Sequence, residues 1–309
     1  MSAEAAPYLL KHAAAADQPG GGTVAVLGLG LMGRPMSRRL AEAGVRVRAW
    51  NRSGVEPLDV PGWSLHPTAE EACDPGADVD TVITVLPGLA PVVEVVDPLL
   101  RPGLTVVVMG TTSPVDLRDW AARALERGAH VVDAPVSGGD VGAATGRLSV
   151  MVGGQEDVVA RLLPLFDVLG AVVRHLGPVG SGQVAKACNQ AVVATTLAVL
   201  GEAVVLAERS GLDVEALLDV LGSGLAGSRA LEVKRDKLAH RDFTPGGLSV
   251  NQHHDLGFVL ATAREVGVAT PVTALVDQLF GAMRWTGRGA EDHSGVLQVV
   301  EDLSGVGRR

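Results

Sequence analysis

Three glycines near the start of the chain have the spacing of a phosphate-binding turn. Residues 23–33 read TVAVLGLGLMG, a short apolar run followed by a G-x-G-x-x-G pattern. In such a turn the first glycine lets the backbone reverse, the second lets it approach a pyrophosphate, and the third lets the following helix pack on the strand. A glycine turn that binds no ligand is the alternative, but an amphipathic segment, Met32 to Ala43, follows. We therefore expect a dinucleotide to contact Gly28, Leu29, Gly30, Leu31, Met32 and Gly33.

The residues after the next apolar run indicate which dinucleotide is bound. The run Val45–Trp50 ends in Asn51, Arg52 and Ser53, where NAD enzymes usually carry the Asp or Glu that holds the ribose 2′-hydroxyl. No carboxylate stands at these positions, and an arginine suits a 2′-phosphate because its guanidinium forms charge-assisted hydrogen bonds. An exposed polar turn is the alternative. The pattern favours NADP, with NAD possible.

A lysine at the start of a long apolar segment could do chemistry if its face of the helix looks into a cleft. Lys186, Asn189 and Gln190 are spaced i, i+3 and i+4, so they share one face of a helix. An ammonium beside a reacting oxygen stabilises negative charge and supplies a proton when hydride is delivered to an aldehyde. We expect burial between two domains to lower the pKa of Lys186, because desolvation disfavours its charged form. A solvated lysine at a helix start is the alternative.

Short, Val-rich runs alternate with helical segments and predict the elements that position these residues. Helices are expected after Thr68 and after Ser113-Pro114, and from Glu156 to Leu169. The alternation predicts an α/β fold with a Rossmann-type, doubly wound, mostly parallel sheet, in which ligands bind beyond the carboxyl ends of the strands. The predicted strands are 24–27, 45–50, 81–86, 104–109, 130–134, 148–152 and 172–176.

After Gly182 the strand signals stop and an all-helical domain is predicted. Residues 182–209 read as one long helix, which is the expected join between the halves. Further helices are expected at 214–221, 228–238, 256–266, 271–285 and 289–303. The chain is thus expected to have a loose tail at 1–22, a dinucleotide-binding domain at 23–179, and a substrate and oligomerisation domain at 180–309.

Charge and hydropathy limit the partners. A net charge of −9 without a Lys/Arg run disfavours nucleic acid and anionic membranes, which bind clustered positive charge. The longest apolar stretch, 191–206, carries Thr195, Thr196 and Glu202, so no membrane span is expected. The apolar stretch near the N-terminus is interrupted by Glu4 and Pro7, which argues against a secretory signal.

The cysteines and histidines of the chain indicate in which cellular compartment it works and whether it binds a metal. Cys73 and Cys188 are too few for a disulfide framework or a cysteine-based metal cluster, which favours a reducing cytoplasm. The run His253-His254-Asp255 places adjacent side chains in different directions on a helix, and no second ligand motif supports it. We expect no metal.

Three motifs, in order along residues 23 to 303, together resemble the β-hydroxyacid dehydrogenase family, which includes 3-hydroxyisobutyrate dehydrogenase. They are the GLGLMG turn, the sequence DAPVSGG at 133–139, and the Gly-x-Gly-x-x-x-Lys segment that ends at Lys186. The resemblance implies that Lys186 is the catalytic acid/base and that the cofactor also contacts Leu86, Pro87 and Thr112. It also implies that Ser137, Gly138 and Gly139 hold the substrate carboxylate. Their backbone N–H groups can form a small nest for it, although a tight strand-to-loop reversal is the bland alternative.

The chain departs from the family pattern at three places. Gln190 stands where the family commonly has a second Asn beside the substrate, and His254 replaces the Lys of a Lys-Asp-Leu motif near the cofactor. His254 is therefore expected near the cofactor, where it would make binding pH-sensitive. Gly247 stands where the family often has Phe, which would remove bulk from the substrate pocket.

The expected function is NADP-dependent hydride transfer between the nicotinamide and a small 3-hydroxy acid/semialdehyde pair. Two alternatives remain: an NADPH-dependent imine reductase, which usually has Asp or Tyr at the position of Lys186, and a non-catalytic nucleotide-binding protein, which would have no need of Lys186 or Ser137. Family members are commonly assembled through their helical domains, so a homodimer or homotetramer is expected.

Overall fold

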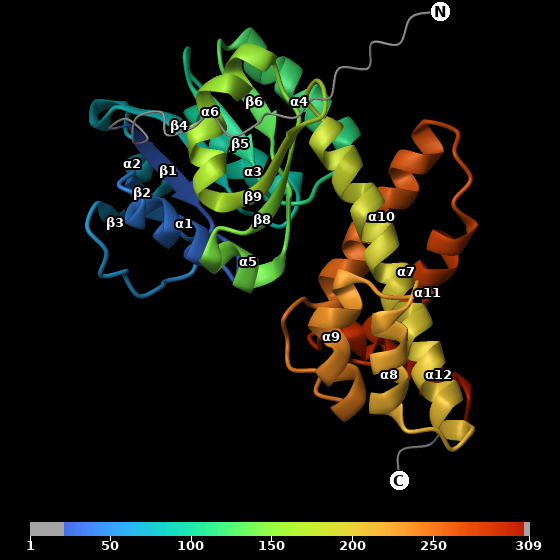
Figure 1. The fold of residues 1–309 in the computed structure, drawn as a ribbon. Helices are drawn as coiled ribbons and strands as arrows, with labels where there is room; N and C mark the ends of the chain where they lie inside the picture. The colour runs from blue at the N-terminus through green and yellow to red at the C-terminus, as the bar shows by residue number, and fades with distance from the viewer. Residues whose placement is uncertain (1–21, 306–309) are drawn as a thin grey trace, which may run out of the picture. The chain divides into compact units, whose positions relative to one another are not determined.

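A computed structural model describes residues 22–305 of the chain (Figure 1). The expected tail at 1–22 lies almost entirely outside the described residues. Contacts divide the chain into two compact units, one that ends at Lys186 and one that begins at Ala187. Each unit has a core of its own.

The first unit is built on a six-stranded parallel sheet with the order β3-β2-β1-β4-β5-β6. This is the strand order of the dinucleotide-binding fold, whose ligand crevice lies at the carboxyl ends of the strands where the order reverses, between β1 and β4. The expected fold class is confirmed. The strands are β1 (Thr23–Leu27), β2 (Arg46–Trp50), β3 (Trp63–Leu65), β4 (Val79–Thr84), β5 (Thr105–Val108) and β6 (His130–Asp133).

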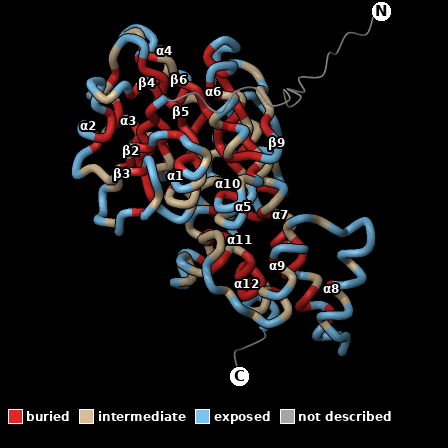
Figure 2. Tube along the Cα trace, turned by 60° about the vertical axis from the view of Figure 1, so that its left-hand side comes forward, coloured by how far each residue is buried: buried red, intermediate tan, exposed pale blue. Residues whose placement is uncertain are grey.

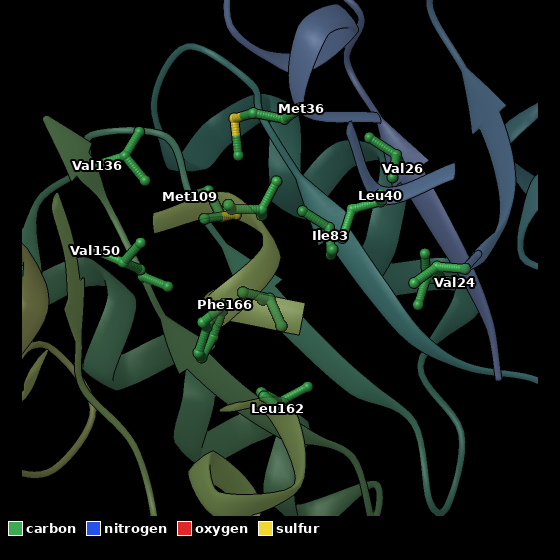
Figure 3. Close-up of a cluster of buried hydrophobic side chains, with 14 of the residues drawn as sticks. Val24, Val26, Met36, Leu40, Ile83, Met109, Val136, Val150, Leu162 and Phe166 are labelled. Carbon is green, nitrogen blue, oxygen red and sulfur yellow. The ribbon is translucent and has the colours of Figure 1, made fainter. Parts of the chain in front are cut away.

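Helices cover both faces of this sheet, because alternate residues of a strand point to opposite sides. Val24 and Val26 of β1 pack with Met36 and Leu40 of α1 and with Phe166 of α6, a cluster drawn in Figure 3. On the other face lie Ala25 and Leu27 with Trp120 of α4. The central strands are therefore almost wholly buried (Figure 2). The helices are α1 (Gly33–Glu42), α2 (Ala69–Ala72), α3 (Leu89–Val96), α4 (Pro114–Glu126), α5 (Gly139–Thr145) and α6 (Glu156–Leu169), with short 3-10 turns η1 (Pro75–Ala77) and η2 (Asp97–Leu99).

The predicted strands at 148–152 and 172–176 do not join the main sheet. They form β8 (Leu148–Val152) and β9 (Gly170–His175), which pair in parallel, while the two-residue strand β7 (Val136–Ser137) pairs antiparallel to β8. Pro135, just after β6, has no N–H to continue the ladder of the main sheet. The chain that follows pairs with β8 instead. The expectation of a single sheet is wrong here, and β3 and β7 were too short to predict.

The second unit is helical around a core that includes Leu197, Leu256 and Phe280. Two predicted helix boundaries are wrong. Helix α10 begins at Ser249, and the segment expected to be helical at 289–303 begins with a 3-10 turn at 293 and becomes α-helical only at 297; backbone N–H groups of Ser249 and Val250 bond to carbonyls in the segment 289–291. The helices are α7 (Ser181–Arg209), α8 (Val214–Ser223), α9 (Arg229–His240), α10 (Ser249–Glu265), α11 (Pro271–Trp285) and α12 (Leu297–Leu303), with the 3-10 turn η3 (His293–Val296).

Helix α7 runs from the first unit into the second. By length and composition it is the one helix within residues 22–305 that is apolar enough to cross a membrane, with a mean hydropathy of 1.8 over its best window. Half of that window is buried inside the protein. Contrary to expectation, α7 passes this test of length and composition despite Thr195, Thr196 and Glu202. A single helix that passes is weak evidence for a membrane span.

Candidate functional site

The glycine turn after β1 has the geometry that its spacing predicts. Gly28 has φ +99°, and a Cβ there would lie 2.4 Å from the carbonyl oxygen of Val85. A Cβ on Gly33 would lie 1.9 Å from the carbonyl oxygen of Gly28, so α1 can begin against the turn only with glycine at this position. Within residues 22–305, no atom outside the two neighbouring residues lies within 4 Å of a Cβ on Gly30. The backbone at Gly30 is therefore open to a ligand. Leu29 beside it is buried, Leu31 is exposed, and Met32 precedes the first residue of α1.

The loops after β1, β4 and β5 lie against one another. A Cβ on Gly28 would meet the side chain of Leu86, and one on Gly110 would lie 2.1 Å from the carbonyl oxygen of Leu86. Leu86 thus lies between the glycine turn and the loop that carries Thr112, and Pro87 follows it in the chain. The Thr112 side chain is 2% exposed, and its hydroxyl is a buried polar group without a hydrogen-bond partner in the described chain. Buried hydroxyls are normally paired, so a polar group of a ligand is its natural partner.

The turn after β2 is tied to the glycine turn. The Asn51 side-chain oxygen accepts a hydrogen bond from the Leu29 N–H at 2.8 Å, and its amide donates to the Ser53 carbonyl at 2.8 Å. Arg52 and Ser53 are exposed beside it. The Arg34 guanidinium, from the first turn of α1, donates to the Glu56 carbonyl at 2.6 Å. A second cation therefore lies along the loop that follows Arg52.

Lys186 is buried and lies beside the predicted carboxylate turn. Its Nζ donates to the Val136 carbonyl oxygen at 2.9 Å, one residue before Ser137. Gly138 has φ +135° and Gly139 has φ +65°, backbone conformations that favour glycine. In the described part of the chain, no atom outside the neighbouring residues and the backbone of α5 lies within 4 Å of a Cβ on Gly139. The ammonium and the Ser-Gly-Gly turn therefore share one short segment of chain.

Two buried polar residues, Asp133 and Gln183, hold the first turn of α7. Lys186 lies in the next turn of the same helix. The Asp133 carboxylate accepts hydrogen bonds from the N–H groups of Gly180 and Gln183, both at 2.7 Å. Burial raises the pKa of Asp133 to about 6, against the backbone N–H groups that favour the carboxylate. The Gln183 side chain accepts from the Thr112 N–H at 3.0 Å and donates to the Gly110 carbonyl at 2.9 Å.

The remaining predicted residues belong to the second unit. The Asn189 amide donates to the Gln190 side-chain oxygen at 3.0 Å, and the Gln190 amide donates to the Asp255 carboxylate at 2.7 Å. His254 is exposed on α10, with its ring edge-on to Phe258 at 4.5 Å. The His293 ring lies 3.3 Å from a Cβ on Gly247. An imidazole therefore adjoins the position at which glycine, in place of the family's Phe, was expected to remove bulk. Within residues 22–305, no group of three His, Cys, Asp or Glu residues is placed to hold a metal ion.

Sequence reasoning missed three residues of this site: Arg34, Asp133 and Gln183. An acidic residue directly after the apolar pair Val131-Val132 is a detectable signal for Asp133, since it places a carboxylate at the carboxyl end of a buried strand. Nothing local marks Gln183, whose partners lie 71 and 73 residues away.

Two family models match the chain in succession. The NAD binding domain of 6-phosphogluconate dehydrogenase matches residues 23–177, and the model described as the NAD-binding domain of NADP-dependent 3-hydroxyisobutyrate dehydrogenase matches residues 180–300.

Relatives of similar length support the same assignment. The chain is 33% identical to the 2-(hydroxymethyl)glutarate dehydrogenase of Eubacterium barkeri, covering 92% of this chain and 96% of that protein. It is 33% identical to the 2-hydroxy-3-oxopropionate reductase of Escherichia coli K12, covering 89% and 96%. The solved structure of Mycobacterium tuberculosis 3-hydroxyisobutyrate dehydrogenase with L-serine has a TM-score of 0.79 and 31% identity, covering 91% and 99%.

Solved imine reductases share the fold at 17 to 22% identity, with TM-scores of 0.58 to 0.60, and that similarity extends to the fold alone. The two family models together span most of the chain, and the relatives cover about nine-tenths of it. The chain belongs to the NAD(P)-dependent β-hydroxyacid dehydrogenase family, of the 3-hydroxyisobutyrate dehydrogenase type.

Proposed function

We propose that this oxidoreductase transfers hydride between NADP and a small 3-hydroxy acid/semialdehyde pair, with Lys186 as the general acid/base. The observation that carries the proposal is the placement of the Lys186 ammonium, buried and 2.9 Å from the Val136 carbonyl oxygen, directly before the Ser-Gly-Gly turn. A short acid held by its carboxylate at that turn brings its 3-oxygen toward Lys186.

The residues of the first unit fit a dinucleotide. The open backbone at Gly30 leaves room for a pyrophosphate, which the N–H groups at the start of α1 would bind. Leu86 adjoins this turn, and Leu86, Pro87 and the Thr112 hydroxyl, which has no partner among the described residues, would contact the nicotinamide half. Arg52, with Asn51 and Ser53, would bind a 2′-phosphate, which favours NADP over NAD. When bound, the nicotinamide donates or accepts the hydride.

Ser137, Gly138 and Gly139 would bind the substrate carboxylate. Successive backbone N–H groups around residues with positive φ form an anion-binding concavity, and the Ser137 hydroxyl adds a donor. This requirement for a carboxylate separates the proposed substrates from the cyclic imines that an imine reductase would accept.

Lys186 would handle the proton. In the reducing direction, its ammonium stabilises the charge that develops on the carbonyl oxygen and then protonates it. In the oxidising direction, the neutral amine removes the hydroxyl proton. Asn189 and Gln190 follow in α7 and would bind the same substrate, and His254 would contact the cofactor.

We also propose a separate role for each of the two parts of the chain. Residues 23–179 would bind the cofactor, and residues 180–309 would complete the substrate site and form a homodimer or homotetramer in the cytoplasm. Exposed apolar side chains support assembly, because Val192, Val199 and Leu206 recur every seven residues along α7. A row with this spacing suits packing against another helix. Sedimentation at micromolar concentration tests the assembly, and a stable monomer would contradict it.

A substrate panel tests the proposed activity. The panel contains short 3-hydroxy acids, their semialdehydes and cyclic imines, and turnover is followed by the absorbance of NADPH. The proposal predicts turnover of the acids and semialdehydes. Turnover of imines alone would identify an imine reductase, and absence of turnover with tight NADPH binding would indicate a non-catalytic protein.

A further inference from the structure

The carboxylate of Asp133 joins the end of β6 to the first turn of α7. One oxygen accepts from the Gly180 N–H and the other from the Gln183 N–H, each at 2.7 Å. The side chain is 0% exposed. N–H groups at the start of a helix have no partners within the helix, so these bonds satisfy donors that water cannot reach.

Two glycines make this contact possible. A Cβ on Gly153 would lie 2.4 Å from one Asp133 carboxylate oxygen, and a Cβ on Gly182 would lie 2.8 Å from the other. The backbone N–H and C=O of Asp133 are themselves paired with Gly153, at 2.9 and 2.8 Å. The carboxylate therefore has a fixed position, set by the backbone on both sides.

Gln183 adds a second attachment for the same turn. Its amide forms two hydrogen bonds with the backbone of the loop after β5, to Gly110 and Thr112. It is 1% exposed. The start of α7 is thus held against the carboxyl ends of two neighbouring strands, β5 and β6.

Lys186 lies one turn further along α7 than Gly182. Its ammonium bonds to the carbonyl of Val136, which is three residues after Asp133 in the same segment. The segment 133–136 therefore contacts α7 twice, through the Asp133 carboxylate at the helix start and through the Val136 carbonyl at the lysine. Two contacts between a rigid helix and a short segment fix the distance between the ammonium and Ser137.

An ionised carboxylate is costly to bury, and Asp133 has no oppositely charged side chain among its hydrogen-bond partners at 2.7 Å. Only a carboxylate accepts from two N–H groups with both oxygens. An asparagine would present an NH₂ group to one of them and leave that donor unpaired. The chain thus retains a costly group whose specific effect is to hold the start of α7.

We propose that Asp133 is a positioning residue for proton transfer, which fixes the start of α7 so that the Lys186 ammonium reaches the substrate oxygen. The inference rests on the proposed role of Lys186. Asp133 itself would touch neither substrate nor cofactor.

A double-mutant cycle tests the proposal. Asp133→Asn, Lys186→Ala and the double variant are compared with the wild type by kcat for semialdehyde reduction, with the KM for NADPH measured in parallel. Displacing a catalytic group by about 1 Å costs roughly 100-fold, so Asp133→Asn should lower kcat by about 10- to 100-fold with little change in this KM. In the Lys186→Ala background, Asp133→Asn should have no further effect, because the group that it positions is gone.

The possible results separate the inference from the proposed function. An equal loss from Asp133→Asn in both backgrounds would overturn the positioning role while leaving the role of Lys186 intact. Near-wild-type turnover of Lys186→Ala would overturn the proposed function and the inference with it. Asp119→Asn, an exposed change on α4, serves as the control and should retain wild-type kcat.

A second variant is used if Asp133→Asn does not fold. If circular dichroism shows that Asp133→Asn does not fold, Gln183→Met replaces it in the same cycle. This change removes the side-chain bonds to Gly110 and Thr112 but leaves the Asp133 contact in place. A loss of kcat that disappears in the Lys186→Ala background supports positioning through α7, and a loss that persists there overturns it.

Discussion

The side chain of Asn51 accepts a hydrogen bond from the backbone N–H of Leu29 at 2.8 Å, so the turn after β2 is attached to the glycine turn after β1. The same side chain donates to the Ser53 carbonyl. Arg52 lies between these contacts, and its backbone position is therefore set relative to the glycine turn. Its exposed side chain is available to a phosphate on the adenosine ribose.

Arg52→Ala should raise the KM for NADPH far more than the KM for NADH. A charge-assisted contact to phosphate contributes roughly 1.5–3 kcal/mol, so an increase of about 10- to 100-fold is expected for NADPH. Arg38→Ala, which removes an exposed arginine that pairs with Glu42 on α1, is the control. Equal effects on both cofactors, or a wild-type preference for NADH, would contradict the assignment.

Ser137→Ala should mainly raise the KM for carboxylate substrates. One neutral donor to a charged group is lost, which corresponds to about 1.5–3 kcal/mol, while kcat changes little because Lys186 remains in place. Methyl esters of the same substrates provide the control, since they lack the charge. If the KM for esters and acids rises equally, Ser137 does not bind the carboxylate.

Lys234→Met should destabilise the second unit by about 3–5 kcal/mol in urea unfolding, because it leaves the Asp292 carboxylate buried without its cation. The Lys234 Nζ lies 2.8 Å from Asp292, which is 0% exposed on its side chain. Burial opposes ionisation of Asp292, yet Lys234 and Ser294 hold its pKa at about 2. Adding Asp292→Asn should recover part of the loss. Lys237→Met, at a more exposed pair, should cost about 1 kcal/mol or less, and equal costs would contradict the account.

Reduction should slow as the pH falls below about 6. Burial raises the pKa of Asp133 from 3.8 to about 6, so acidification protonates the carboxylate and removes one of its two acceptors. Because the folded-state pKa is raised, the contribution of Asp133 to stability is greatest at low pH and decreases as the pH rises from about 4 to 6. A loss of activity on acidification would therefore not reflect this carboxyl destabilising the fold.

The measurement is kcat against pH for reduction at saturating NADPH. Charged or titratable groups that contact the segments around Asp133 include Lys186 on α7, which bonds to the Val136 carbonyl, Arg118 on α4, whose Nε lies 2.7 Å from a Cβ on Gly180, and His175 on β9, which bonds to the carbonyls of Gly154 and Gly177. The acid decline should persist in His175→Gln and be absent in Asp133→Asn. Its loss in His175→Gln would assign the decline to the histidine.

Local signals account for what the sequence could predict. The glycine turn, the strands β1, β2, β4, β5 and β6 and the start of α4 each depend on neighbouring residues, and the Ser113 side chain accepts from the Asp116 N–H as its position predicts. Helix α11 was predicted at its observed bounds, because Pro271 marks its first turn. The strand order follows from general rules for α/β folds.

The sequence could not show contacts between distant segments. The separate sheet of β7, β8 and β9 depends on which strand β8 meets after the turn at Pro135, and the early start of α10 depends on the segment 289–291. The attachment of α7 by Asp133 and Gln183 joins residues 47 to 73 positions apart. Spacing within one helix predicted the face of Lys186 but not the carbonyl that its ammonium meets.

The turnover number of Lys186→Ala on the best substrate of the panel tests the central claim most directly. A positioned general acid/base contributes about 10²–10⁴-fold, so kcat should fall by that factor while NADPH affinity stays nearly unchanged. Lys186→Arg should not restore alcohol oxidation, because a guanidinium keeps its proton and cannot act as the base. Near-wild-type kcat in Lys186→Ala would contradict the account, because the proton would then have to come from another group.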